Sequence, residues 1–174
     1  RVEGIVLREP FGRTGVPPEG DDVLRGRLTD ERELSARAQA LGLRRAAQYL
    51  PATVRAERPS PSSDPIAGHR RGIAFLDAVA HTVNAAGHTG LFSLRGDSEV
   101  AMILALKDSR NIDTALATLG ARLREQVRRV DGAPVSVLAL GPPVEQIADA
   151  VSGLAEAAHI AEVALAQGDR DRPY

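Results

Sequence analysis

Polar residues interrupt two apolar runs in the segment GLFSLRGDSEVAMILAL, residues 90–106. The interruption consists of Arg95, Gly96, Asp97 and Ser98, and Glu99 follows directly. Three interpretations are open: a plain hairpin turn, an exposed Arg-Gly-Asp adhesive loop, or the remainder of a catalytic turn. The adhesive loop is disfavoured, because this tripeptide occurs often by chance in an arginine-rich chain and the chain has no cysteine or secretion signal.

The other residues that could take part in catalysis or ligand binding do not form known motifs for catalytic, phosphate-binding or metal-binding sites. The chain contains no Gly-x-Ser-x-Gly and no phosphate-binding Gly-x-x-x-x-Gly-Lys-Ser/Thr motif, and its histidines lack metal-ligand spacing. These histidines are His69, His81, His88 and His159. We therefore expect no metal ion and no cofactor.

One basic cluster stands out, formed by Arg122, Arg124, Arg128 and Arg129. On a helix, Arg122 and Arg129 share one face, and Arg124 and Arg128 share another. A solvated helix face is favoured over a phosphate-binding surface, because no aromatic residue is interleaved for stacking on bases.

Composition narrows the class of protein. The 174 residues are 43% hydrophobic, which suits a folded domain with a real core, and the net charge of -1 gives no general attraction to nucleic acid. No apolar run is long enough to span a membrane, and cysteine is absent, so we expect a cytoplasmic protein. Because the sequence begins at Arg1, we also expect it to be part of a longer protein.

Pattern changes divide the chain into three parts. Residues 1–20 are rich in glycine and proline and predict a linker or the end of a preceding domain. Residues 21–45 predict a helical lead-in, with a capping box at Asp30 and Glu33 and a helix end at Gly42. Residues 46–174 predict the main domain.

Within the main domain, periodicity predicts alternating strands and helices. Strands are expected at residues 49–57, 90–94, 100–106 and 134–140, with Pro51 moving the first of them towards an edge or an irregular start. Four helices are expected in this domain. One ends near Gly87, and a second follows the apolar positions from Ile112 to Val127. A short third helix begins at Val144, and a longer fourth one begins at a Ser152 cap. This order predicts a β-α-β-β-α-β core whose helices lie on one face of the sheet.

Three stretches of the chain resemble the GGDEF nucleotide-cyclase domains, and more closely their degenerate relatives in the PucR/CdaR family of bacterial transcription regulators. The first is DDVLRGRLTDERELSARAQALGL, similar to the family's helical lead-in, and the second is GDSEVAMILAL. The third is LALGPPVEQIADAVSGLAEAAHIAEVAL, which contains a Ser-x-x-x-Glu-Ala helix at Ser152, Glu156 and Ala157. One departure is Leu154, where the family often has an aromatic residue. The resemblance implies an α/β (α+β) fold with a ferredoxin-like or cyclase-like antiparallel sheet, helices packed on it, and an N-terminal helical lead-in.

The resemblance also implies that the chain is not an enzyme. Active cyclases carry a Gly-Gly-Asp/Glu-Glu-Phe turn whose acids, with an acid on the first strand, hold Mg²⁺ against the nucleotide phosphates. If Glu99 and Val100 align with the final Glu-Phe, Asp97 replaces a glycine and Ser98 replaces a metal ligand. A shift by one puts Arg95 at the first glycine and Glu99 at the phenylalanine. The first strand offers only Glu57, and the inhibitory Arg-x-x-Asp site is absent just upstream of the turn.

We therefore interpret residues 95–99 as a hairpin turn that has lost the catalytic residues of a cyclase, with Gly96 at positive φ. The resemblance then implies a regulatory, signal-transmitting domain of a PucR-like regulator, which contacts its own preceding sensor, its following DNA-binding domain and a homodimer partner. DNA would be bound only indirectly, outside this chain, and no membrane is involved. The alternative is a domain that binds a nucleotide or small metabolite without turnover. The lead-in helix could fold back on its own sheet, which we favour, or pair with a second copy.

Overall fold

The computed structural model describes residues 6–7, 30–57, 64–106, 112–133 and 135–167. The strands are β1 (Val6–Leu7), β2 (Gln48–Ala56), β3 (Thr89–Arg95), β4 (Glu99–Leu106) and β5 (Ser136–Leu140). The helices are α2 (Glu31–Ala40), α3 (Pro65–Ala85), α4 (Ile112–Asp131) and α5 (Ile147–Ala166). Most of the predicted linker, the start of the predicted lead-in and residues 168–174 lie outside the described residues.

The strands form one sheet in the order β1-β3-β4-β2-β5. Strands β2 to β5 pair antiparallel, and β1 adds a short parallel edge beside β3. From β2 onward the elements follow the sequence β2-α3-β3-β4-α4-β5, which confirms the predicted β-α-β-β-α-β core and the mixed α/β fold.

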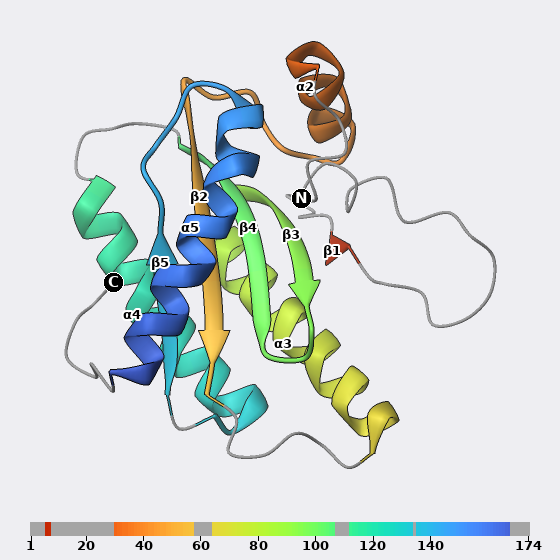
Figure 1. Cartoon of the computed structure of the whole chain (residues 1–174), viewed down its shortest axis with the longest axis vertical. Coiled ribbons are helices and arrows are strands. Elements are labelled where there is room, and N and C mark those ends of the chain that lie inside the picture. The colour runs from red at the N-terminus through yellow and green to blue at the C-terminus, as the bar shows by residue number, and fades with distance from the viewer. Residues whose placement is uncertain (1–5, 8–29, 58–63, 107–111, 134, 168–174) are drawn as a thin grey trace.

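Helices cover both faces of this sheet, so the prediction that they lie on one face is wrong. Figure 1 shows α5 in front of the sheet and α3 and α4 behind it. The reason lies in β4, where Met102 packs in the cluster with α3 and α4, while Ile103 packs in the other with α2 and α5. Because successive strand residues point to opposite faces, a strand that is apolar throughout requires cover on both sides.

Pro51 lies in an interior strand, between β4 and β5, so the edge position is wrong. The other predicted alternative, an irregular start, agrees with the pairing of β2 with β5. The pairing of β2 with β5 ends at Ala52, and beyond it the Gly141 N–H donates to the Pro51 carbonyl at 2.8 Å. The next contact is a reciprocal pair of hydrogen bonds between Tyr49 and Val144. Alternate N–H groups of a strand point the same way, so the missing N–H of Pro51 falls where the neighbouring chain bulges.

The ends of α2 and α5 can be compared with the predicted helix ends. The Asp30 carboxylate caps α2 by accepting from the Arg32 N–H at 2.9 Å, and Gly42 follows the helix end with a positive φ of 93°. The predicted capping box is only half formed, because the Glu33 carboxylate accepts from Arg37 at 3.1 Å. In contrast, α5 is one helix from Ile147 to Ala166, so neither the short helix at Val144 nor a cap at Ser152 exists. Ser152 lies inside α5, where its hydroxyl donates to the Ala148 carbonyl.

Candidate functional site

The segment 95–99 forms the predicted hairpin turn at one end of the sheet (Figure 1). Arg95, the last residue of β3, pairs with Glu99, the first residue of β4, which leaves three residues in the turn. Gly96 has a φ of 68°, so the predicted positive φ is confirmed. A residue with a Cβ is strained in this left-handed region, which explains glycine at this position.

Glu99 lies beside an arginine of the neighbouring strand. Arg55 is directly opposite Glu99 in the register of β2 and β4, and Arg55 Nη1 lies 3.3 Å from Glu99 Oε2. The Glu99 side chain is only 14% exposed, so the ion pair partly excludes water. Glu162 of α5 lies 4.0 Å from the same Arg55 nitrogen. The guanidinium therefore stands between two carboxylates, on the face of the sheet that α5 covers.

Helix α3 packs closely on the other side of the turn. A Cβ placed on Gly72 would lie 2.9 Å from Leu94 Cδ2 and 3.5 Å from the Asp97 Cα. The absence of a side chain at Gly72 lets the helix backbone approach the turn. Asp97 and Ser98 are half-buried there, and the Ser98 carbonyl accepts a hydrogen bond from the Ala56 N–H.

The candidate acids do not gather into a metal centre. Glu57, the first-strand acid, is exposed just beyond β2. Within the described ranges, no three His, Cys, Asp or Glu side chains are grouped so that they could hold a metal ion. The Glu99 carboxylate is bound to a cation of the protein itself, the Arg55 guanidinium.

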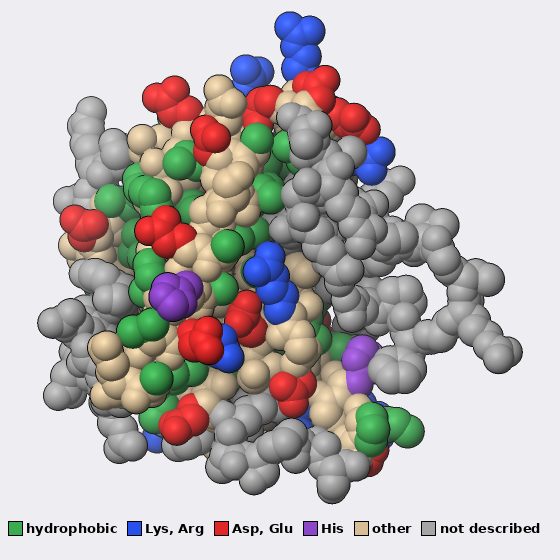
Figure 2. All heavy atoms as spheres, in the orientation of Figure 1, with side chains coloured by type: hydrophobic (Ala, Val, Ile, Leu, Met, Phe, Trp, Pro, Cys, Tyr) green, Lys and Arg blue, Asp and Glu red, His purple; other side chains and the backbone are tan. Residues whose placement is uncertain are grey.

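The predicted motif helix is α5, and its three residues have different surroundings. Ser152 and Glu156 are exposed, whereas Ala157 is fully buried against the sheet. Leu154, at the position where an aromatic residue was expected, is 1% exposed and packs in the core with α2. Figure 2 shows acidic and hydrophobic side chains interspersed over the face that α5 forms, with few basic ones.

Sequence reasoning missed Glu31, the first residue of α2. Its two carboxylate oxygens accept from the first amides of α5, Oε1 from the Ile147 N–H at 3.1 Å and Oε2 from the Ala148 N–H at 2.9 Å. The residue at the N-cap of α5, Gln146, makes no side-chain cap of its own. An acid is favourable at a helix N-terminus, where unpaired N–H groups carry partial positive charge. The only sequence signal was the lack of a good capping residue before α5.

The prediction that Arg122 and Arg129 share one face of α4 is confirmed, because both line the same groove. The shared face of Arg124 and Arg128 stays a prediction. Glu125 accepts from Arg128 at 2.6 Å and from Arg129 at 2.9 Å, and these hydrogen bonds, that of Arg128 first, lower the pKa of the Glu125 carboxyl. Arg122 and Arg129 face α3 across a groove that also contains His81. His159 is exposed on α5.

In the part of the chain that the structure describes, no helix has the length and apolar character that crossing a membrane requires. No curated protein matches the chain in sequence. The family model described as a GGDEF-like domain matches residues 25–163, which include the lead-in helix, the four antiparallel strands and nearly all of α5. The chain belongs to the GGDEF-like domain family.

Proposed function

We propose that this chain is a non-catalytic regulatory domain of a PucR-like transcription regulator, which transmits a signal through domain or dimer contacts. The observation that carries the non-catalytic part is the pairing of Glu99 with Arg55 across β2 and β4. In this proposal the guanidinium takes the place, beside the turn acid, that a divalent cation has in active cyclases.

The surroundings of the turn support the same proposal. A cyclase turn needs paired glycines so that the backbone can approach a nucleotide. Here one of these positions is Asp97, and the close backbone approach is instead between the turn and α3 at Gly72. A nucleotide phosphate would also have to compete with Glu99 and Glu162 for Arg55, and repulsion by two carboxylates opposes its binding.

The regulatory part of the proposal rests on the lead-in helix. Leu34 and Ala38 of α2 and Leu43 after it are buried in the same core as α5, and Glu31 binds the first turn of α5. Any rearrangement of a sensor that precedes α2 would therefore act directly on α5. The resemblance to PucR-like regulators supplies the expected neighbours, a sensor before this domain and a helix-turn-helix after it, in a cytoplasmic protein.

The chemical part is tested by incubating the purified chain with GTP and Mg²⁺ and separating the nucleotides by chromatography. An active cyclase serves as the positive control, and a sample without protein as the blank. We expect no cyclic dinucleotide above the blank. Product formation that disappears in the Glu99→Gln variant would refute the non-catalytic role.

The indirect relation to DNA is tested with the same chain. A net charge of -1 provides no general attraction to phosphates, so duplex DNA should bind only non-specifically and weakly. A sequence-specific complex in a mobility-shift gel at physiological salt would contradict the proposal that recognition lies in another domain.

Self-association is tested by sedimentation. Because α2 uses its apolar residues within its own domain, we expect weak self-association at most for the isolated chain. A tight dimer that becomes monomeric when the chain begins at Arg45 would show instead that α2 is a dimer interface.

A further inference from the structure

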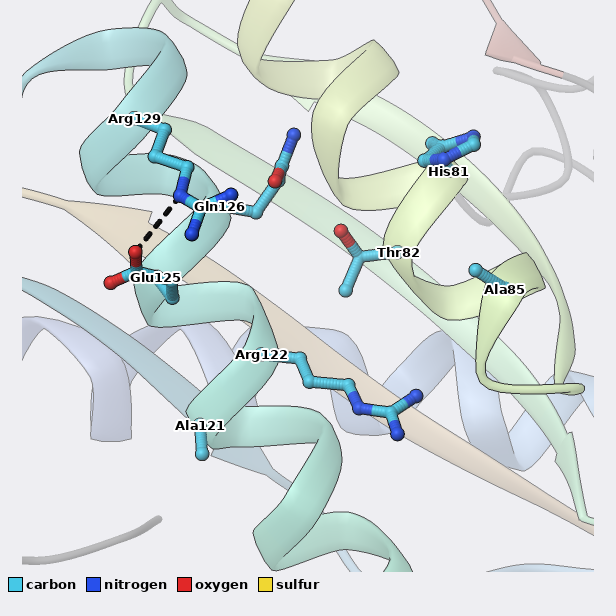
Figure 3. A pocket seen from close by; sticks show the side chains of 8 residues that line it. All are labelled: His81, Thr82, Ala85, Ala121, Arg122, Glu125, Gln126 and Arg129. Carbon is cyan, nitrogen blue, oxygen red and sulfur yellow. Dashed lines mark hydrogen bonds and ion pairs between the residues drawn. The ribbon is translucent and has the colours of Figure 1, made fainter.

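An open groove of about 460 Å³ runs between α3 and α4, on the face of the sheet opposite α5. Its walls include His81 and Ala85 of α3, and Ala121, Arg122, Gln126 and Arg129 of α4. Figure 3 shows the side chains of Arg122 and Gln126 extending from α4 into the space between the two helices. The groove contains no residue of the β3–β4 turn, so it is a separate feature of the molecule.

Small and apolar groups form the hollow. Ala85 and Ala121 end at the Cβ, which leaves room where longer side chains would fill the groove between the two helices. Thr82, also in the wall, is 8% exposed and uses its hydroxyl proton in a 2.7 Å bond to the Ala78 carbonyl. These surfaces suit the compact apolar part of a ligand, and the volume lies within the range of small-molecule sites, on the order of 300–1,000 Å³.

The charged side chains that line the groove have a net positive charge, because two arginines, Arg122 and Arg129, accompany one acid. Its acid, Glu125, is already bound by Arg128 and by Arg129 through Nε, and its lowered pKa keeps it ionised. None of the described residues forms an ion pair with Arg122. Arg122 can therefore give all its guanidinium N–H groups to a ligand, and the terminal nitrogens of Arg129 are not used by Glu125.

We propose that this groove binds a small organic anion, a carboxylate or phosphate attached to a compact apolar body. Arg122 binds the anionic group, with the amide of Gln126 and the imidazole of His81 as further polar contacts. The apolar body lies against Ala85 and Ala121. The proposal concerns α3 and α4 alone and does not depend on whether the β3–β4 turn is catalytic.

The test is an NMR titration of the ¹⁵N-labelled chain with four probes: benzoate, phenyl phosphate, inorganic phosphate and benzyl alcohol. We expect benzoate or phenyl phosphate to shift the amides around His81, Ala85, Arg122 and Gln126 with millimolar affinity. Inorganic phosphate lacks the apolar body and benzyl alcohol lacks the charge, so both should bind more weakly. A preference between benzoate and phenyl phosphate identifies the anionic group.

Two variants make the result specific. Arg122→Gln should weaken binding of the preferred probe about tenfold or more, the loss expected for a charged hydrogen bond. Arg124→Gln removes the same charge from the same helix outside the groove, and should leave the affinity unchanged. The proposal is overturned if neither anionic probe shifts the groove amides, if the shifts centre on residues 95–99, or if both variants weaken binding equally.

Discussion

The two ends of the sheet use a glutamate in different ways. At the turn end, formed by residues 95–99 with Arg55, the Glu99 carboxylate binds a side-chain cation on the adjacent strand. At the lead-in end, formed by α2 and the start of α5, the Glu31 carboxylate binds two backbone amides of another helix. The ion pair between β2 and β4 is added to strands whose backbones are already paired next to the turn. A helix cap between separate elements joins parts of the chain that lie more than a hundred residues apart in sequence.

Helix α5 reaches both ends. Its first amides contact Glu31, and Glu162 in its last turns lies 4.0 Å from Arg55. Between them, Ala150, Leu154, Ala157 and Ala161 are buried against the sheet and α2. At the lead-in end, Ile147, Ala150 and Leu154 of α5 share one buried cluster with α2. We therefore expect substitutions at the lead-in end to cost more stability than substitutions at the turn end.

The largest contrast is expected from leucine truncations at the two ends. Leu34 is 1% exposed, whereas Leu94 beside the turn is half-buried. Leu34→Ala should lower the free energy of unfolding by about 2–5 kcal/mol, and Leu94→Ala by less. Urea denaturation followed by circular dichroism measures both. An equal or larger loss of unfolding free energy in Leu94→Ala would contradict the larger contribution of the lead-in end to stability.

The contact between α5 and β2 provides the next test. A Cβ on Gly153 would lie 2.8 Å from Pro51 Cγ, and the proline ring is too rigid to yield. Gly153→Ala should destabilise the domain by about 1–2 kcal/mol, after the gain in helix propensity is deducted. The neighbouring Ser152→Ala, on the exposed side of α5, is the control and should change stability little. A stabilising Gly153→Ala would mean that α5 is not closely packed on Pro51.

At the turn end, a smaller effect is expected from Gly96. An alanine with this φ of 68° should lower the free energy of unfolding by about 1 kcal/mol, although no described atom beyond the two chain neighbours lies within 4 Å of an added Cβ. Gly96→Asn should lose less, because asparagine tolerates this conformation better. The difference in unfolding free energy between the two variants is the measurement, and equal losses would point to a contact rather than to the backbone.

The smallest effect is expected from the ion pair itself. In a double-mutant cycle with Arg55→Met and Glu99→Gln, the coupling free energy should be below about 1 kcal/mol, because Arg55 is 32% exposed and solvent screens the pair. Urea denaturation of the four proteins gives the value. A coupling of several kcal/mol would show that the turn end depends on this pair and that the two ends do not differ as described.

Local patterns were sufficient to predict the core elements. The hairpin, the positive φ at Gly96 and the amphipathic α4 follow from residues adjacent in sequence or on one helix face. Two of the errors arose where distant residues decide the outcome, whereas helices on both faces of the sheet could have been predicted from the unbroken apolar run of β4. Pro51 is tolerated because the chain beyond β5 bulges, and α5 begins at Ile147 because Glu31, more than a hundred residues earlier, supplies its cap. The pairing of Arg55 with Glu99 likewise depends on strand register, which composition and periodicity do not reveal.

Glu31 joins the lead-in helix to α5. Amide hydrogen exchange of the whole chain, measured by NMR, tests this connection directly in the Glu31→Gln variant. We predict that the amides of Ile147 and Ala148 lose protection about fivefold, the equivalent of ~1 kcal/mol for a weakened cap, while residues 95–99 keep their rates. Glu33→Gln, which affects only a pair with Arg37 on the same helix, should leave α5 unchanged. Unaltered exchange at Ile147 and Ala148 in Glu31→Gln would contradict the role of Glu31 as the cap of α5.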